Sequence, residues 1–98
     1  MRVSKISYCD IMSHVNSKQK RTLAAVFTDP ASASIAWKDI ESLFVALDVE
    51  VVEGSGSHVR FHREGVIASF HRPHPRKEAK PYQVKDARVF LKQLGVEP

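Results

Sequence analysis

The sequence predicts an α+β fold, and changes in its periodicity support this. Ile40, Leu43, Phe44 and Leu47 recur at i, i+3, i+4 and i+7, the spacing of one face of an α-helix. Between residues 58 and 70 apolar and polar residues alternate, as they do in strands with one buried face. The helical period returns after residue 82. The expected order is helix, helix, strand, strand, strand, helix.

The first two helices are expected from their end signals. Ser17–Phe27 is the first, with its own first residue as the cap and Asp29-Pro30 as its stop. The second follows Ser34, which is expected to cap it, and places Trp37 on the same face as Ile40. The first helix lies before the helical and strand pattern that begins with Ile40, and it is therefore an extra N-terminal helix.

Three strands follow, at Val49–Glu53, His58–Arg63 and Val66–Phe70. Glu64-Gly65 lies between the last two and predicts a two-residue hairpin turn. Counting outward from this turn places three pairs on one half-polar face: His58 with His71, Arg60 with Ser69, and His62 with Ile67. Directly opposed Cβ atoms lie about 4.5–5.5 Å apart, so two imidazoles are expected side by side. The opposite, apolar face is expected to pack on the helices.

The two ends of the chain are expected to differ. The last helix runs from about Tyr82 to Leu94, with Pro81 near its start and Gly95 just after its end. Residues 1–16 show no clear period and are predicted to form a loosely held tail without regular structure. Residues 17–98 are predicted to form a single domain.

Composition limits the classes of function. The formal net charge is +4, and most of the basic side chains between residues 58 and 82 have no acidic neighbour in sequence, which favours a polyanionic partner. The single cysteine, Cys9, excludes a disulfide within the chain and argues against a thiolate metal site. No apolar run approaches membrane-spanning length. We therefore expect a cytoplasmic protein that does not associate with membranes.

The histidine pair is the candidate for chemistry. One imidazole can take a proton from a ribose 2′-hydroxyl while an acid protonates the leaving oxygen, with Arg60 or Arg72 stabilising the phosphorane charge. This reaction requires no metal and no cofactor. The alternative is that two cross-strand histidines are ordinary surface residues. A zinc site is not expected, because His58 and His62 would lie roughly 13 Å apart along one strand.

Two further segments each allow two interpretations. Gly54-Ser55-Gly56-Ser57 is either a loop whose N–H groups contact phosphate or a flexible turn between strands. The segment from Arg72 to Lys77 contains Pro73 and Pro75, which favour a stiff, extended path. It is either a basic arm along nucleic acid or a linker to the last helix.

These residues together resemble a known family. Gly56-Ser57-His58 opening a strand, the hairpin into Phe70-His71-Arg72-Pro73-His74-Pro75, and the closing helix with Val89-Phe90-Leu91 are similar to the HicA toxins of bacterial toxin–antitoxin pairs. The helix that begins at Trp37 also resembles the first core helix of that family. The resemblance extends over roughly residues 17–96.

The resemblance implies a fold like a double-stranded-RNA-binding domain, with a three-stranded antiparallel sheet and helices on one face. It implies an endoribonuclease that cleaves mRNA (an mRNA interferase), slows translation and growth, and is blocked by a HicB-type antitoxin in a complex. The family's active histidine corresponds to His58, and the strand register adds His71 in a supporting role. The residues expected to contact RNA are Ser57, Arg60, His62, Arg72, His74, Arg76, Lys77 and Lys80.

Two other functions remain open on the same fold. One is a non-catalytic RNA-binding module, whose affinity would fall steeply with salt. The other is a protein-interaction domain whose basic face recognises an acidic partner.

Overall fold

The computed structural model describes residues 15–31 and 33–98, and within them the elements follow the expected order. They are helices α2 (Ser17–Val26) and α3 (Trp37–Ala46), strands β1 (Glu50–Glu53), β2 (His58–Arg63) and β3 (Val66–His71), and helix α4 (Pro81–Gln93). The predicted α+β fold is therefore confirmed. The run from α3 to α4 is compatible with the expected likeness to a double-stranded-RNA-binding domain.

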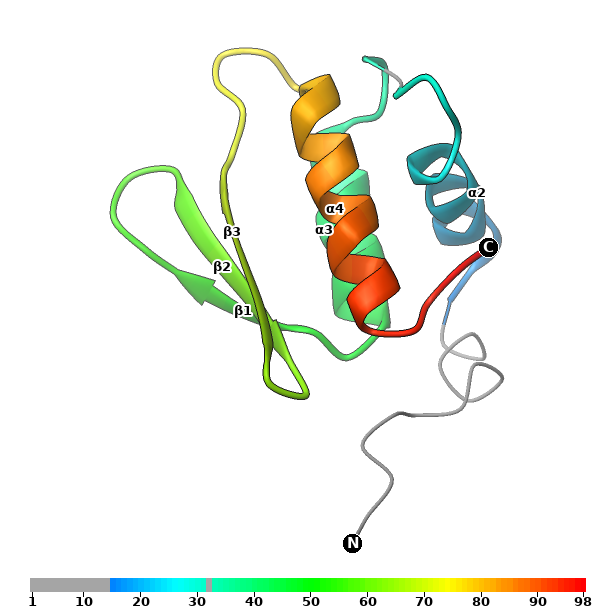
Figure 1. Cartoon of the computed structure of the whole chain (residues 1–98). Helices are drawn as coiled ribbons and strands as arrows, with labels where there is room; N and C mark the ends of the chain where they lie inside the picture. Colours follow the sequence, from blue (N-terminus) through cyan, green and yellow to red (C-terminus); the bar gives the residue numbers. More distant parts are fainter. Residues whose placement is uncertain (1–14, 32) are drawn as a thin grey trace, which may run out of the picture.

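The elements form layers (Figure 1). The strands make one antiparallel sheet in the order β1-β2-β3. Helices α3 and α4 pack on one face of this sheet, and α2 contacts both of them on the side away from the strands. Within the described part of the chain, no helix lies against the other face of the sheet, which we call the open face.

The β2–β3 hairpin has the predicted turn and register. Glu64 and Gly65 both adopt positive φ, 52° and 81°, the conformation that two-residue hairpin turns require. Pairing then follows the predicted register from Arg63 opposite Val66 to His58 opposite His71. Because side chains alternate along a strand, this register sends one set to the core and leaves the other on the open face.

An aromatic cluster forms the centre of the core between sheet and helices. Its members come from α3, β2, β3 and α4 and are all at most 5% exposed: Trp37, Phe44, Phe61, Phe70 and Phe90. The rings of Phe44 and Phe61 have centroids 4.9 Å apart in an edge-to-face arrangement, and Phe44 meets Phe90 at 5.2 Å in the same way. The expectation that the apolar face of the strands packs on the helices is confirmed.

The N-cap of helix α2 is Asn16 and not, as was predicted from the sequence, Ser17. Ser17 is the first helical residue, and Asn16 is the N-cap. The Asn16 side chain accepts from the Gln19 N–H at 2.8 Å, and the Gln19 side chain accepts from the Asn16 N–H at 2.9 Å. This reciprocal pair satisfies two N–H groups at once, which explains why the cap lies one residue earlier than predicted.

The expectation that Ser34 caps the second helix is wrong. The N-cap of α3 is Ala36, which has no side-chain oxygen to offer. Instead, Ala36 and Glu78 form an isolated antiparallel bridge, and the Trp37 N–H donates to the Lys77 carbonyl at 2.8 Å. A backbone partner distant in sequence therefore does what a capping side chain does elsewhere.

Strand β2 has its predicted bounds, and several other element ends differ from the prediction by one residue. Helix α2 ends at Val26 and not at Phe27. Strand β1 begins at Glu50 because the Val49 N–H donates to the Phe44 carbonyl at 3.0 Å, which closes the end of α3. Strand β3 extends to His71 because that residue pairs with His58. Helix α4 starts and ends one residue before its predicted bounds.

Of the predicted tail, residues 1–14 lie outside the described residues. Val15 is buried in the core cluster and Asn16 caps α2. No helix in the described ranges is long and apolar enough to cross a membrane.

Candidate nucleic-acid interface and histidine pair

Two imidazoles face each other where β2 begins and β3 ends. The rings of His58 and His71 have centroids 5.0 Å apart and planes inclined by 32°. His58 is half-buried and His71 is exposed, and both lie on the open face of the sheet. The hairpin register therefore brings together the two histidines that the sequence singled out. Such a pair can contact one small group from the solvent side.

Gly54 leaves the space that His58 occupies. A Cβ at position 54 would lie 3.0 Å from Nδ1 of His58 and 3.1 Å from its backbone oxygen. The backbone closes the loop tightly, since the Gly54 N–H donates to the His58 carbonyl at 2.8 Å and the His58 N–H donates to the Ser55 carbonyl at 3.0 Å. The Gly-Ser-Gly-Ser segment is thus a compact turn between β1 and β2.

Arg72, directly after His71, is held by two carboxylates. Its Nη1 and Nη2 donate to the two oxygens of Glu53 at 2.6 and 2.9 Å, and its Nε donates to Glu41 of α3 at 2.9 Å. The hydrogen bond to Glu53 is the main cause that raises the pKa of Arg72, and the same bond lowers the pKa of Glu53. Three of the five guanidinium N–H groups are thus bound to carboxylates of this chain, so most of the donors of Arg72 are already engaged.

A buried glutamine of α4 holds the other histidine. Gln83 is 2% exposed, and its amide donates to the His71 carbonyl at 2.6 Å while its oxygen accepts from the Lys80 N–H at 3.0 Å. Gln83, Glu41 and Glu53 were not among the site residues predicted from the sequence. For Gln83 a signal existed, because a polar residue stands on the apolar stripe of the helix.

Two other candidate residues lie on the open face beside the pair. Arg60 is exposed opposite Ser69, next along the strand from the histidines. His62 lies one further pair along the strand, half-buried opposite Ile67, and its Nε2 is buried with no hydrogen-bond partner within the described part of the chain. His62 is thus separated from the His58–His71 pair by the Arg60 position.

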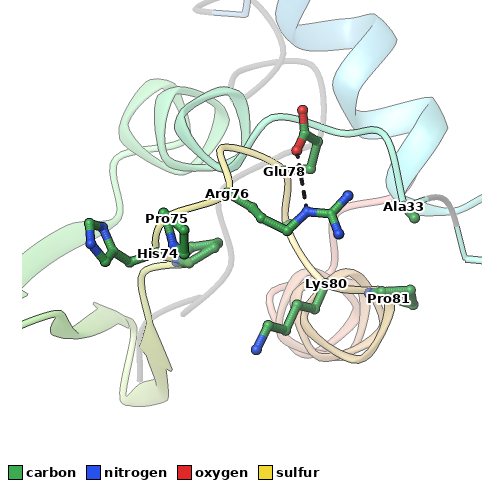
Figure 2. Close-up of a pocket in the computed structure, with 9 residues that line it drawn as sticks. Ala33, His74, Pro75, Arg76, Glu78, Lys80 and Pro81 are labelled. Carbon is green, nitrogen blue, oxygen red and sulfur yellow. Dashed lines mark ion pairs between the residues drawn. The ribbon is translucent and has the colours of Figure 1, made fainter.

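The remaining predicted RNA contacts lie in the segment between β3 and α4, which we call the basic arm (residues 72–80). Its side chains His74, Arg76, Lys77 and Lys80 are exposed. Figure 2 shows Arg76 directed toward Glu78, with Nε and carboxylate oxygen 3.9 Å apart, while the imidazole of His74 lies away from that guanidinium. His74, Arg76 and Lys80, but not Lys77, line a cavity of about 250 Å³ together with prolines of the arm and the start of α4. Ser57 joins the arm to the loop, because its carbonyl accepts from the Arg72 N–H at 2.9 Å.

No group of three or more histidine, cysteine, aspartate or glutamate side chains that could hold a metal ion occurs among residues 15–31 and 33–98. His58 and His71 thus form a pair without a third ligand beside them in these ranges. The carboxylates of Glu41 and Glu53 are bound to Arg72.

The comparison with protein families agrees with the resemblance. Residues 37–96, more than half of the chain, match the model of the HicA toxin of bacterial toxin–antitoxin systems. This range starts at the first residue of α3 and includes the sheet, the basic arm and α4. No curated protein and no solved structure matches the chain. Because the family model matches more than half of the chain, including the His58 loop and the basic arm, we conclude that this chain belongs to the HicA family of toxins from bacterial toxin–antitoxin systems.

Proposed function

We propose that this toxin is an endoribonuclease that cleaves mRNA in the cytoplasm without a metal ion, with His58 and His71 as its proton-transfer groups. The observation that supports this most strongly is the imidazole pair, whose ring centroids are 5.0 Å apart on an open sheet face. Two imidazoles at this separation can reach the attacking and the leaving oxygen of one phosphodiester. Histidine is also the side chain best suited to proton transfer near neutral pH.

The proposed reaction is an internal transesterification. One imidazole removes the proton of the ribose 2′-hydroxyl, whose oxygen bonds to phosphorus. The bond from phosphorus to the 5′-oxygen breaks, and that oxygen takes a proton from the second imidazole. The products are a 2′,3′-cyclic phosphate and a 5′-hydroxyl. Arg60, exposed beside the pair, is the cation that stabilises the charge of the phosphorane.

RNA binding is assigned to the surface that continues from the histidine pair. Ser57, His62 and the basic arm (His74, Arg76, Lys77 and Lys80) extend the site on either side of it. Contacts between exposed cations and phosphates release counterions, so RNA affinity is expected to fall steeply as salt rises. A HicB-type antitoxin is expected to neutralise the toxin by covering the open face and presenting acidic groups to it.

RNA cleavage by purified protein in EDTA tests this proposal. His58→Ala and His71→Ala are each expected to lower kcat by about 10²- to 10⁴-fold, the usual contribution of one general acid or base. The matched variant is His62→Ala, on the same face but outside the pair, which is expected to raise KM and to leave kcat close to wild type.

The results distinguish the proposed ribonuclease from the two alternative functions. Cleavage by His58→Ala at the wild-type rate refutes the assignment of that histidine. Wild-type protein that binds RNA and never cleaves it is a non-catalytic RNA-binding module. Protein that neither binds nor cleaves RNA is an interaction domain for an acidic partner.

A further inference from the structure

Arg72 connects three segments that meet at the histidine pair. Its guanidinium holds Glu53 at the end of β1 and Glu41 on α3. Its backbone N–H donates to the Ser57 carbonyl at 2.9 Å, and Ser57 immediately precedes His58. Through its peptide bond it is also joined to His71. Arg72 therefore contacts both ends of the loop between Glu53 and His58, and it is the residue directly after His71.

The loop between Glu53 and His58 is short, so its ends determine where the imidazole lies. Glu53 is followed directly by Gly54, whose missing side chain leaves the space for the His58 ring. Fixing the Glu53 carboxylate fixes the start of this loop, and the hydrogen bond to Ser57 fixes its end. The loop is thereby held at both ends by the same residue.

The guanidinium and the imidazoles lie on opposite sides of the sheet. His58 and His71 belong to the open face, whereas Glu41 lies on α3, which covers the other face. Arg72 side-chain atoms are thus directed away from the face where RNA would meet the histidines. Any influence of the guanidinium on the pair passes through the backbone of the loop and of β3.

The ion pairs contribute more to geometry than to overall stability. Glu53 is well exposed, with 64% of its side chain accessible, and exposed pairs typically add little to the free energy of unfolding. A two-point arginine–carboxylate contact does, however, fix direction as well as distance, because the guanidinium is planar and rigid. Lysine supplies the same charge without that fixed geometry.

We propose that Arg72 is a positioning residue for the histidine pair: by gripping Glu53 and Glu41 and bonding to the Ser57 carbonyl, it sets the separation and orientation of His58 and His71. This inference rests on the proposed ribonuclease function for its kinetic consequences, but not for its structural ones. It assigns to Arg72 a role other than the RNA contact expected from the sequence.

The test compares Arg72→Lys with Arg88→Lys. Arg88 is a matched control because three of its guanidinium nitrogens are likewise engaged, by an ion pair to Asp29 at 2.7 Å and by the backbone oxygens of Val26 and Thr28, which join α4 to the end of α2. Two properties are measured: the kinetics of RNA cleavage, and the NMR signals of the imidazoles, including the cross-peak between the ring protons of His58 and His71.

Arg72→Lys is expected to lower kcat by about 10- to 100-fold, the size of effect that a small misplacement of catalytic groups produces. KM for RNA is expected to stay within about twofold of wild type, as for a residue that does not bind substrate. The imidazole signals shift and their cross-peak weakens. Arg88→Lys keeps wild-type values in both measurements.

Other results overturn the proposal. If KM rises while kcat is unchanged, Arg72 is an RNA contact. If neither kcat nor the cross-peak changes, Arg72 does not position the pair. If Arg72→Lys fails to fold, Glu53→Gln, which keeps the shape but not the charge of the carboxylate, is judged by the same criteria. If wild-type protein cleaves no RNA, the proposed function fails, and the NMR comparison alone decides whether Arg72 holds the imidazoles in place.

Discussion

Gly54→Ala places one additional methyl group against the imidazole of His58. The new Cβ would lie 3.0 Å from Nδ1, 3.1 Å from the backbone oxygen and 3.3 Å from the Cβ of His58. Carbon atoms in favourable contact lie about 3.5–4.0 Å from their neighbours, so all three distances are too short. The ring can rotate away from the methyl group. The backbone oxygen cannot do so alone, because it accepts the Gly54 N–H at 2.8 Å.

The magnitude follows from these contacts. Overpacking of this kind costs about 1–3 kcal/mol, and replacing glycine by alanine returns about 0.4–1 kcal/mol by restricting the unfolded chain. The net loss in the free energy of unfolding is therefore roughly 0–2.6 kcal/mol, with a midpoint of about 1.3 kcal/mol. The larger effect is expected on catalysis, since the displaced group is the proposed proton-transfer residue. We expect kcat to fall by at least about tenfold.

Gly65→Ala provides a control of similar cost. Gly65 has a φ of 81° in the hairpin turn, and a Cβ there would meet no atom within 4 Å. Alanine in this left-handed conformation costs about 1–2 kcal/mol from strain alone. Urea denaturation is expected to show similar losses for both variants, whereas RNA cleavage falls only for Gly54→Ala. Equal cleavage by the two variants, at a temperature where both are folded, would show that the space beside His58 does not matter.

Three further outcomes are expected. Phe61→Ala, at the centre of the aromatic cluster, lowers the free energy of unfolding by about 3–5 kcal/mol in urea denaturation, or the core is not packed as described. The Glu53 carboxylate has a pKa below its ordinary value of 4.5, so its pair with Arg72 stabilises the fold above that value and is lost as the pH falls through the lowered pKa; acid titration of the melting temperature should show this loss, reduced in Glu53→Gln and at high salt. Asn16→Ala costs about 1 kcal/mol of stability and Ser17→Ala much less, and the reverse order would contradict the observed cap.

Much of the site's geometry was predictable because it depends on neighbours in sequence. A two-residue turn at Glu64-Gly65 leaves only one register, and that register determines which side chains oppose each other. The proximity of His58 and His71 therefore follows from counting residues. The role of Gly54 could not be predicted in this way, because it depends on how the loop folds back against His58 at the start of β2.

The caps and the partners of the arginine were not predictable in the same way. Ser34 has the chemistry of a cap, but the backbone near Trp37 is satisfied by Lys77, forty residues later. Arg72 looked like a cation available to RNA because neither of its acidic partners, Glu41 and Glu53, is near it in sequence. Which groups meet across such separations is decided by the packing of α3 and the arm against the sheet.

The elements, the hairpin register and the pairing of His58 with His71 follow from local sequence patterns, because periodicity and turn chemistry act over a few residues. Three features depend on packing across the whole fold: the helices leave the histidine face open, two carboxylates bind Arg72, and Gln83 donates to the His71 carbonyl. These contacts join groups between twelve and thirty-one residues apart in the sequence. Their partners are selected by burial and by the need to satisfy polar groups, which no local pattern records.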